Sequence, residues 1–518
     1  MEYVNTVDAP SYGTSDKATE LLKKYKEAQG IKDYWKDRFE EAYEYCLPNR
    51  ESFYDESPGQ RRTDKIFDET AVVGVQEFAS RLQAGITPTF ARWADFQAGS
   101  EIPKEQKPQI NLDLDKITEY VFELLQTSNF NQEIHEAFMD LAIGTGVLLV
   151  EEGDAINPIK FTSIPLTKVC LMNGPDGKID TVYRTRYCKP EEILILYPKA
   201  TLPENFDPLK QKKQIKIIEA VYKIHKPNVE EFKLCVFMED PKHVLFEEEY
   251  KGEGSNPYLV FRWNKASGEV YGRGPVFNAM SAIKTCNLTI ELILQNAQMS
   301  VSGVYTYEDD GVINPDNISL VPGSLIPVAP GSRGLTPIQA ASNFDVAQLV
   351  LNDMRANIKK ALYMEALGKP EGTPMTATEV SERMADLSRQ IGASFGRLQS
   401  ELINPLLRRI IRILSKQGRI DVPKINGREV KVAPRSPLAQ AQHLQDVADV
   451  TRFNEIIAGT FGPQMINLIV DQNATAKYLA EKMNLPEKLI RDEQEQKQLA
   501  DRMSQLQQSA GEEAPPES

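Results

Sequence analysis

Apolar residues recur at steps of three and four along the stretch 376–417, which is the pattern of one long amphipathic helix. The stripe consists of Val380, Met384, Leu387, Ile391, Phe395, Leu398, Leu402, Leu406, Ile410 and Leu414. At a rise of roughly 1.5 Å per residue, a straight helix over these residues would be about 63 Å long. Pro405 removes one intrahelical hydrogen bond and clashes with the preceding turn, so we expect the helix to kink there.

A loop rich in glycine and proline comes directly before this helix. Residues 367–375 read LGKPEGTPM, and the following TATE (376–379) has the capping-box pattern, in which a Thr hydroxyl and a Glu side chain satisfy the first helical amides. The glycines permit backbone angles that are closed to other residues, whereas the prolines limit collapse of the chain. The sequence therefore predicts an adaptable loop held against a well-defined helix start.

The whole chain has the pattern of an α+β protein that is mainly helical. Strand-like runs separated by Gly, Pro and Asn predict a mostly antiparallel β section from about 147 to 264, interrupted by a short helix over 190–197. A hairpin with Asn426-Gly427 as its turn is expected over 422–432. Asp113 and Asp115 precede the third helix, where carboxylates suit the positive end of the helix dipole. Apolar periodicity predicts the other helices over 16–46, 64–84, 113–128, 131–142, 275–298, 343–366 and 437–508.

Two of these helices flank a segment that is rich in turn-forming residues. The helix 275–298 has Pro275 in its first turn, where the missing N–H costs nothing. Residues 299–342 are rich in Gly, Pro, Ser and Val, which predicts short strands and turns. The helix 343–366 is expected to carry one apolar side, made by Val346, Leu349, Val350, Met354, Ile358, Ala361 and Leu362.

Composition narrows the class of protein. The 518 residues include 74 acidic and 60 basic ones, a formal charge of −14, which argues against gripping nucleic acid through its phosphates but not against a surface past which nucleic acid moves. No run approaches 18 apolar residues, and the first residues lack the pattern of a signal peptide, so neither a membrane span nor a leader is expected. The five cysteines are scattered and never spaced CxxC, which favours a reducing setting over a disulfide framework or a zinc site.

No catalytic, cofactor-binding or metal-ligating residues are predicted. The chain has no GxxxxGK[ST] phosphate loop, and GTGVLL (144–149) lacks the third glycine of a dinucleotide fingerprint. His135-Glu136 is not followed by a second histidine at 139, so the zinc-protease motif is incomplete. With four histidines in the chain, the usual general base is scarce.

Several segments, taken in order, resemble the portal proteins of short-tailed bacteriophages (podophages), also called the head-to-tail connector family. The segment closest to that family is RWNKASGEVYGRGPVFNAMSAIKTCN (262–287). The others are DETAVVGVQEFASRL (68–82), WADFQ (93–97), AIGTGVLLVEE (142–152), TATEVSER (376–383), RLQSELINPLLRRIIRIL (397–414) and SPLAQAQ (436–442). Together they span roughly residues 60–500, so the resemblance covers most of the chain.

The resemblance implies a portal fold that assembles as a dodecameric ring around an axial DNA channel. It assigns 1–271 to the wing, 272–298 to stem helix 1, 299–342 to the clip and 343–366 to stem helix 2. Residues 367–375 would be the channel loop, 376–436 the long kinked wing helix with its hairpin, and 437–518 the crown helices with a tail of disordered composition. The function it implies is a conduit at one capsid vertex for packaging and ejecting double-stranded DNA.

The resemblance also implies site residues. The channel loop facing DNA would comprise Gly368, Lys369, Pro370, Glu371, Gly372 and Thr373, unless this segment is an ordinary surface connection. Arg355, Lys359 and Lys360 are candidates for basic residues facing the lumen, the alternative being a solvated outer helix face or contacts with a neighbouring subunit. The clip interface between subunits is expected at Val304, Tyr305, Tyr307 and Glu308.

The partners implied by the family are further copies of the chain, double-stranded DNA bound without sequence specificity, and other phage proteins. Those are the terminase large subunit, the tail adaptor and tail proteins, the major capsid and scaffolding proteins, and internal core proteins. No cofactor, membrane or enzymatic activity is implied. The protein would be made in the bacterial host cytoplasm and reside in the virion, at the unique vertex where head and tail meet.

Two other readings of the chain stay open. One is a DNA-packaging enzyme, that is, a terminase-type ATPase or nuclease, which the missing phosphate loop disfavours. The other is a helical scaffold protein unrelated to phage, which leaves the ordered family segments unexplained.

Overall fold

The computed structural model describes residues 14–54, 63–99, 102, 107–203, 206, 214–226, 229–302, 305–306, 330, 336–337, 344–364, 391–420, 430–462 and 469–482. The chain divides into two compact units, which are described separately. The first comprises Met1–Arg81, Leu124–Gly368 and Gly396–Val422, and the second Leu82–Glu123, Lys369–Phe395 and Pro423–Ser518. Both helices and strands are present, as the α+β prediction requires.

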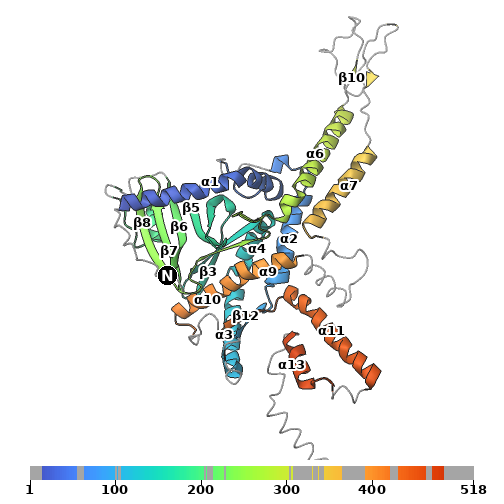
Figure 1. The fold of residues 1–518 in the computed structure, drawn as a ribbon. Helices are drawn as coiled ribbons and strands as arrows, with labels where there is room; N and C mark the ends of the chain where they lie inside the picture. The colour runs from blue at the N-terminus through green and yellow to red at the C-terminus, as the bar shows by residue number, and fades with distance from the viewer. Residues whose placement is uncertain are drawn as a thin grey trace, which may run out of the picture. The chain divides into compact units, whose positions relative to one another are not determined.

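A five-stranded antiparallel sheet in the first unit is covered by one long helix. The strand order is β4-β5-β6-β7-β8, with bounds Val169–Asn173, Ile179–Cys188, Ile215–Lys226, Val229–Met238 and His243–Lys251. Helix α1 (Thr14–Cys46) lies across these strands and contacts both edge strands, β4 and β8 (Figure 1). Its side chains Leu21, Leu22 and Tyr25 are buried against the sheet. The helix predicted over 16–46 is thereby confirmed.

Successive side chains of each strand point to opposite faces of this sheet, and the face away from α1 packs in a second apolar cluster. In β7, Cys235 and Phe237 pack with α1, whereas Val236 and Met238 pack on the opposite side. That side holds Ile193 of the short helix α5 (Pro190–Leu196), at the position predicted for a short helix. The period of two along each strand therefore divides one sheet between two apolar clusters.

A second, three-stranded sheet lies in the same unit with the order β3-β2-β9 (Ile159–Ser163, Thr145–Glu152 and Tyr258–Arg262). The central strand β2 contacts α4 (Phe130–Ile143) and α10 (Asn404–Lys416). Its first six residues, TGVLLV, are all buried, which is why they are apolar or small throughout instead of alternating with polar residues.

The start of β2 and the start of α6 (Pro275–Ser302) meet at a contact between three glycines. A Cβ added to Gly144 would lie 2.1 Å from the carbonyl oxygen of Gly272, and one added to Gly274 would lie 2.1 Å from that of Ala142. The Gly274 N–H donates to Ile143 O over 2.7 Å, so the two backbones are directly bonded. Only glycine permits this approach, and the contact joins two segments of the family resemblance, 142–152 and 262–287.

Helices α6 and α7 (Phe344–Ala361) pack side by side and extend from the sheets of the first unit (Figure 1). Helix α6 also contacts α1 and α4 near its beginning. It continues one turn past residue 298, to Ser302, whereas α7 ends at Ala361, before the expected end at 366.

The predicted long helix is interrupted within its described part. From Gly392 it consists of α9 (Gly392–Leu398), a π-helical segment η5 (Gln399–Ile403) and α10. The Asn404 N–H donates to Gln399 O, and Pro405 follows in the first turn of α10. The wider π turn makes room for the proline ring, which would otherwise clash with the carbonyl four residues earlier. An irregularity at Pro405 was predicted; its π-helical form was not.

The second unit contains a two-stranded pairing between distant segments. Strand β1 (Ala94–Ala98) pairs antiparallel with β12 (Val430–Pro434). Trp93 packs edge-on against Phe122 of α3 (Lys107–Thr127), with ring centroids 5.0 Å apart. Further along the chain, α11 (Pro437–Phe461) contacts α13 (Gln472–Lys482). The rest of the predicted hairpin over 422–432, including Asn426-Gly427, lies outside the described residues.

Three sequence predictions need correction. Asp113 and Asp115 do not precede α3, because that helix begins at Lys107; Asp115 instead binds Arg92. Within the predicted β section, the strand-like pattern of IKFTSIPLTKVCLMN (159–173) favours one continuous run, but the structure divides it at Pro165 into β3 and β4 of different sheets. Strand β1 was not predicted. Strand β8 lies within the predicted β section but was not recognised as a separate run, because it is an edge strand whose EEE run hides the alternation of apolar residues.

The remaining helices agree with the sequence in kind and position. Helix α2 (Thr70–Ile86) begins six residues after the start predicted for the helix over 64–84, and the short helix η1 (Thr63–Lys65) precedes it. Helix α4 occupies the stretch predicted over 131–142. All five cysteines are buried thiols without disulfide partners. Within the described residues, no helix combines the length and apolar character that a membrane crossing requires.

Candidate functional site

The α6–α7 pair and its base carry the described part of the predicted site. The channel-loop residues Gly368–Thr373, and Val304, Tyr307 and Glu308 of the clip, lie outside the described residues. Tyr305 is described: it forms part of the short strand β10 (Tyr305–Thr306), which pairs with β11 (Thr336–Pro337) of the same chain. Both short strands fall in the turn-rich segment where short strands were predicted.

Lys359 and Lys360 are exposed in the last turn of α7, where positive charge is favoured by the helix dipole. Arg355, one turn earlier, is different, because it forms an ion pair within the chain. Its Nη2 lies 2.8 Å from Oδ2 of Asp68, and its Nε donates to the same oxygen over 2.9 Å. Of the three basic residues singled out in the sequence, the two lysines therefore hold their charge at the surface, while Arg355 has a buried partner.

Asp68 connects three helices. Burial alone would raise its pKa, but hydrogen bonds from Thr70 and Arg355 outweigh that effect and leave the pKa below its ordinary value. The Asp68 side chain accepts from the Thr70 N–H at the start of α2 over 2.9 Å. Asn287 of α6, itself buried, accepts from the backbone N–H of Phe67 over 2.7 Å. The start of α2 is thus bound both to α6 and to α7.

Large aliphatic side chains remain uncovered on the outside of the helix pair. Of the apolar side predicted for α7, Ile358 and Leu362 are buried, whereas Leu349 is 65% exposed. Leu351, which was not part of that prediction, is also buried. Helix α7 therefore has two apolar sides, of which the chain itself covers one. The exposed aliphatic residues of the pair are Leu288, Leu292 and Leu294 on α6 and Leu349 and Val350 on α7.

Helix α7 ends in a turn that requires a left-handed residue. Tyr363 has φ 58°, the single positive value among the described non-glycine residues. The Met364 N–H donates to Lys359 O over 2.9 Å and the Tyr363 N–H to Lys360 O over 3.2 Å, which is the Schellman pattern. Glycine usually fills this position, because a side chain there costs about 1–2 kcal/mol.

Contacts with α2 hold this turn in place. The Arg81 guanidinium donates to the backbone carbonyls of Tyr363 and Met364. A Cβ on Gly74 would lie 2.5 Å from the side chain of Leu362, so the end of α7 approaches α2 as closely as a glycine allows. The chain is therefore fixed at residue 364, directly before the segment that contains the predicted channel loop.

The helix after that segment is fixed to the end of β9. Arg262 is 3% exposed and meets Glu401 of the π turn with three donors. Its backbone N–H donates to Oε2 over 2.9 Å, and its Nη2 donates to Oε1 over 2.6 Å. One residue on, the Trp263 carbonyl accepts from Nη1 of Arg397 over 3.0 Å. Arg262 and Trp263 lie in one segment singled out in the sequence (262–287), and Arg397 and Glu401 lie in another (397–414). No sequence signal predicted that the two segments meet.

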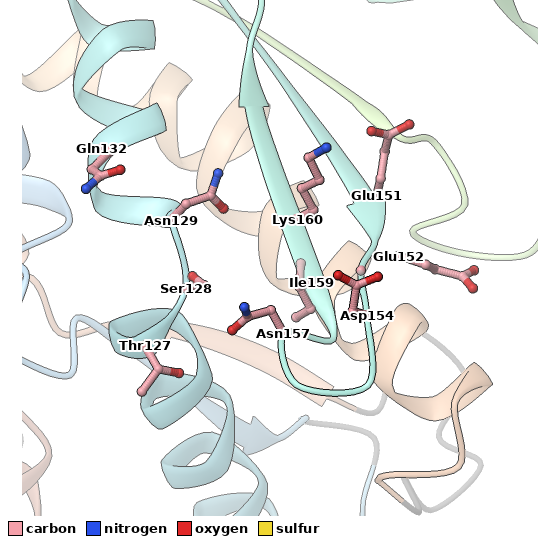
Figure 2. A pocket seen from close by; sticks show the side chains of 11 residues that line it. Thr127, Ser128, Asn129, Gln132, Glu151, Glu152, Asp154, Asn157, Ile159 and Lys160 are labelled. Carbon is pink, nitrogen blue, oxygen red and sulfur yellow. The ribbon is translucent and has the colours of Figure 1, made fainter. Parts of the chain in front are cut away.

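A polar groove of about 680 Å³ lies between the α3–α4 connection and the β2–β3 turn (Figure 2). Asn129 bonds the backbone of Phe161 through both amide atoms, and Glu152 pairs with Lys416 over 2.6 Å. The side chains of Asn129 and Glu152, which line the groove, are therefore already bonded to other residues of the chain. Among the described residues, no group of three or more His, Cys, Asp or Glu side chains is arranged to hold a metal ion.

Comparison with known proteins finds the same family that the sequence segments resemble. The family described as bacteriophage head to tail connecting protein matches residues 18–490 of this chain. The probable portal protein of Bordetella phage BPP-1 is 23% identical over 531 residues, covering 95% of this chain and 92% of that protein. The portal protein of Salmonella phage epsilon15 is 21% identical over 445 residues, covering 82% and 79%. A chain from the neck of a native GTA particle with C12 symmetry is 12% identical, with a TM-score of 0.37, and the match covers 80% of this chain and 91% of that chain.

Proposed function

This chain belongs to the bacteriophage head to tail connecting protein family, and we infer from this membership that it is a phage portal protein. Portal proteins form the ring at one vertex of the capsid through which double-stranded DNA is packaged and later ejected. The observation that carries this function is the family match over residues 18–490, with two portal proteins aligned along most of the chain. The ring is a structural conduit, and we propose that the chain works without catalytic activity of its own.

We propose a ring of twelve copies, in which the exposed aliphatic side chains of α6 and α7 meet the neighbouring copy. Leu288, Leu292 and Leu349 are each at least half exposed in the single chain. Burying a leucine contributes about 1.5–3 kcal/mol, so three such side chains per interface would favour association substantially. The two helices would then be the stem helices that surround the channel.

The other regions follow the family order. Residues 1–271 would form the wing, 299–342 the clip at the narrow end of the ring, and 437–518 the crown. The clip would dock the terminase large subunit during packaging and the tail adaptor afterwards. Major capsid and scaffolding proteins would contact the wing, and internal core proteins the crown. In the virion, the ring would lie at the vertex where head and tail meet.

Net charge suits a channel through which DNA slides. Twelve copies at −14 each carry a formal charge of −168, and negative charge around a channel keeps phosphates from adhering. We propose that Lys359 and Lys360 provide local rings of positive charge near the channel loop. Arg355 is a weaker candidate than the lysines because its charge is balanced by Asp68. The loop Gly368–Thr373 stays in the proposal as the segment that faces DNA.

The test is the oligomeric state of the full chain. Native mass spectrometry of the wild type should show rings near twelve copies. A triple variant, Leu288→Gln, Leu292→Gln and Leu349→Gln, should remain folded by circular dichroism, because these side chains are exposed in the single chain, but should lose most of the ring population.

Ile156→Gln provides the matched control. Ile156 is 87% exposed at the β2–β3 turn and belongs to neither α6 nor α7, so its replacement should leave ring formation unchanged. A wild type that stays monomeric at every concentration would contradict the ring itself. Rings of normal yield from the triple variant would contradict the interface.

A further inference from the structure

The chain before residue 365 and helix α9 after residue 390 are attached to the same residue. On the N-terminal side, the ring of Tyr363 packs against Trp263 with centroids 5.8 Å apart. On the C-terminal side, Arg397 donates to the Trp263 carbonyl over 3.0 Å. Tyr363 and Arg397 thus meet through the side chain and the backbone of one tryptophan.

Trp263 is itself immobilised by its surroundings. It is 1% exposed, and its backbone N–H donates to Gly144 O over 2.9 Å. Phe78 of α2 packs edge-on against the indole, with ring centroids 5.1 Å apart. Burial raises the pKa of the Tyr363 hydroxyl, and a side-chain hydrogen bond with Trp263 opposes part of that rise, so indole and phenol are also polar partners.

The residue before Trp263 strengthens the attachment on the C-terminal side. Arg262 and Glu401 form a two-oxygen ion pair, and the π turn brings Glu401 and Arg397 to the same end of β9. If the helix moved along its axis, Glu401 and Arg397 would each lose a charge-assisted hydrogen bond. The dipeptide Arg262-Trp263 therefore binds the long helix through its side chain and its carbonyl.

We propose that Trp263 couples the end of α7 to α9, so that a displacement of Tyr363 is felt by Arg397 and a displacement of Arg397 by Tyr363. The inference rests on the proposed function, in which the segment 365–390 between these flanks contains the channel loop. Trp263 acts here as a positioning residue: Tyr363 contacts its ring and Arg397 its carbonyl oxygen, so it relays motion between the end of α7 and α9. Because coupling free energies are reciprocal, each flank must affect the other equally.

The left-handed turn at Tyr363 makes the N-terminal flank responsive. The turn carries the cost of a non-glycine residue at positive φ, and ring contacts with Trp263 and Phe78 offset that cost. A shift of the indole would remove this support, and the final turn of α7 would loosen. The two flanks then differ from ordinary loop ends, which can move independently.

Hydrogen exchange on the full chain tests the coupling. Arg397→Gln removes the donor to Trp263 O and should speed amide exchange in 396–403 about ten-fold, the effect of losing one charge-assisted hydrogen bond. It should also speed exchange in 358–364, about three-fold, although the hydrogen bond that the variant removes goes to Trp263 and not to that stretch. Tyr363→Leu should give the reciprocal pattern, with faster exchange in 396–403.

Arg408→Gln is the matched control, because Arg408 is an exposed arginine on α10 whose partner is Glu253, 2.9 Å away. It should leave both stretches unchanged. Should Arg397→Gln fail to fold, Arg397→Met removes the donor while keeping the length of the side chain, and it is scored by the same two stretches. Exchange that rises only on the mutated side in both variants would overturn the coupling.

The exchange measurement is made on single chains before ring assembly, so it is independent of the portal assignment. Uncoupled flanks in a chain that still forms rings would overturn this inference alone. Coupled flanks in a chain that never forms rings would contradict the proposed function and leave the coupling in place.

Discussion

Asp140 lies fully buried on α4, next to a tyrosine and an arginine. The Tyr43 hydroxyl donates to its Oδ1 over 2.9 Å, and Arg50 approaches its Oδ2 to 3.6 Å. Burial raises the pKa of Asp140 from 3.8 to about 6, with Arg50 opposing part of the shift. The folded chain therefore binds more protons than the unfolded chain between these two values.

Because the pKa of Asp140 is raised in the folded chain, its effect on stability depends on pH in the direction opposite to that of an ordinary salt-bridged aspartate. The free energy of unfolding should fall as pH rises from about 4 to about 6, by up to about 3 kcal/mol from this group. Asp140→Asn keeps an acceptor for Tyr43 but does not titrate, so that part of the fall should disappear. Urea unfolding between pH 4 and 7 measures it. Asp154→Asn, at an exposed turn, should keep the wild-type profile; identical profiles for Asp140→Asn and wild type would exclude a raised pKa.

Two Gly→Ala changes should have opposite effects on stability, because one glycine lies in the glycine contact at the start of α6 and the other has free space around it. At Gly274 a Cβ would lie 2.1 Å from Ala142 O, a backbone atom that cannot move aside, so Gly274→Ala should destabilise the chain by about 2–4 kcal/mol. Gly30 lies in α1 with no heavy atom within 4 Å of its added Cβ, so Gly30→Ala should stabilise by about 0.5–1 kcal/mol. Thermal unfolding of both variants measures these two changes in stability. If both variants changed in stability by the same amount, the backbone at the glycine contact would have to relax around the added Cβ.

Among the elements, the interrupted long helix gives a test of how much Pro405 matters. Because Pro405 follows the π turn in the first turn of α10, its missing N–H costs little there. Pro405→Ala should therefore change the free energy of unfolding by less than about 1 kcal/mol, well below the ~3 kcal/mol of a proline inside a helix.

Arg408→Pro supplies the comparison, since it places a proline in the interior of α10 at an exposed position. This variant should lose about 3 kcal/mol or more in chemical unfolding. A large gain in stability for Pro405→Ala would show that the proline strains the helix and that the π turn does not accommodate it.

At the scale of the whole molecule, the channel-loop proposal separates flexibility from charge. Deleting Pro370–Thr373 should leave folding and ring assembly intact, because the contacts at Tyr363 and Arg397 lie outside the deletion. DNA packaging, or retention of packaged DNA, should fall, since the shortened loop reaches less far into the channel. Packaged DNA protected from nuclease measures the effect in rings that assemble normally.

The charge variant Lys369→Gln with Glu371→Gln is the control for that deletion. In the wild-type loop the charges of Lys369 and Glu371 nearly cancel, so removing both changes the net charge little. The charge variant should therefore reduce packaging far less than the deletion does. A crippled charge variant beside a tolerated deletion would show that the loop acts through its electrostatic field instead of its shape and length.

Local pattern determined which segments of this protein are helices and where most of its strands lie. The helix predicted over 16–46 is α1 (Thr14–Cys46), because the spacing of its apolar residues directly reflects the one side buried on the sheet. The same reasoning located the β section and the irregularity at Pro405. It failed where charge masks alternation, as in β8, and where a short strand such as β1 finds its partner far along the chain.

Only the tertiary structure decided which of these elements meet. Arg262 and Glu401 are 139 positions apart, and nothing in either segment names the other as its partner. The same holds for the contact of Gly144 with Gly272 and for Tyr363 and Arg397 on Trp263. Local propensity and periodicity depend on neighbours within a few residues, whereas these pairings depend on the path of the whole chain. That path is chosen by which apolar surfaces can be buried together, and it brings Tyr363 and Arg397, 34 positions apart, to one tryptophan.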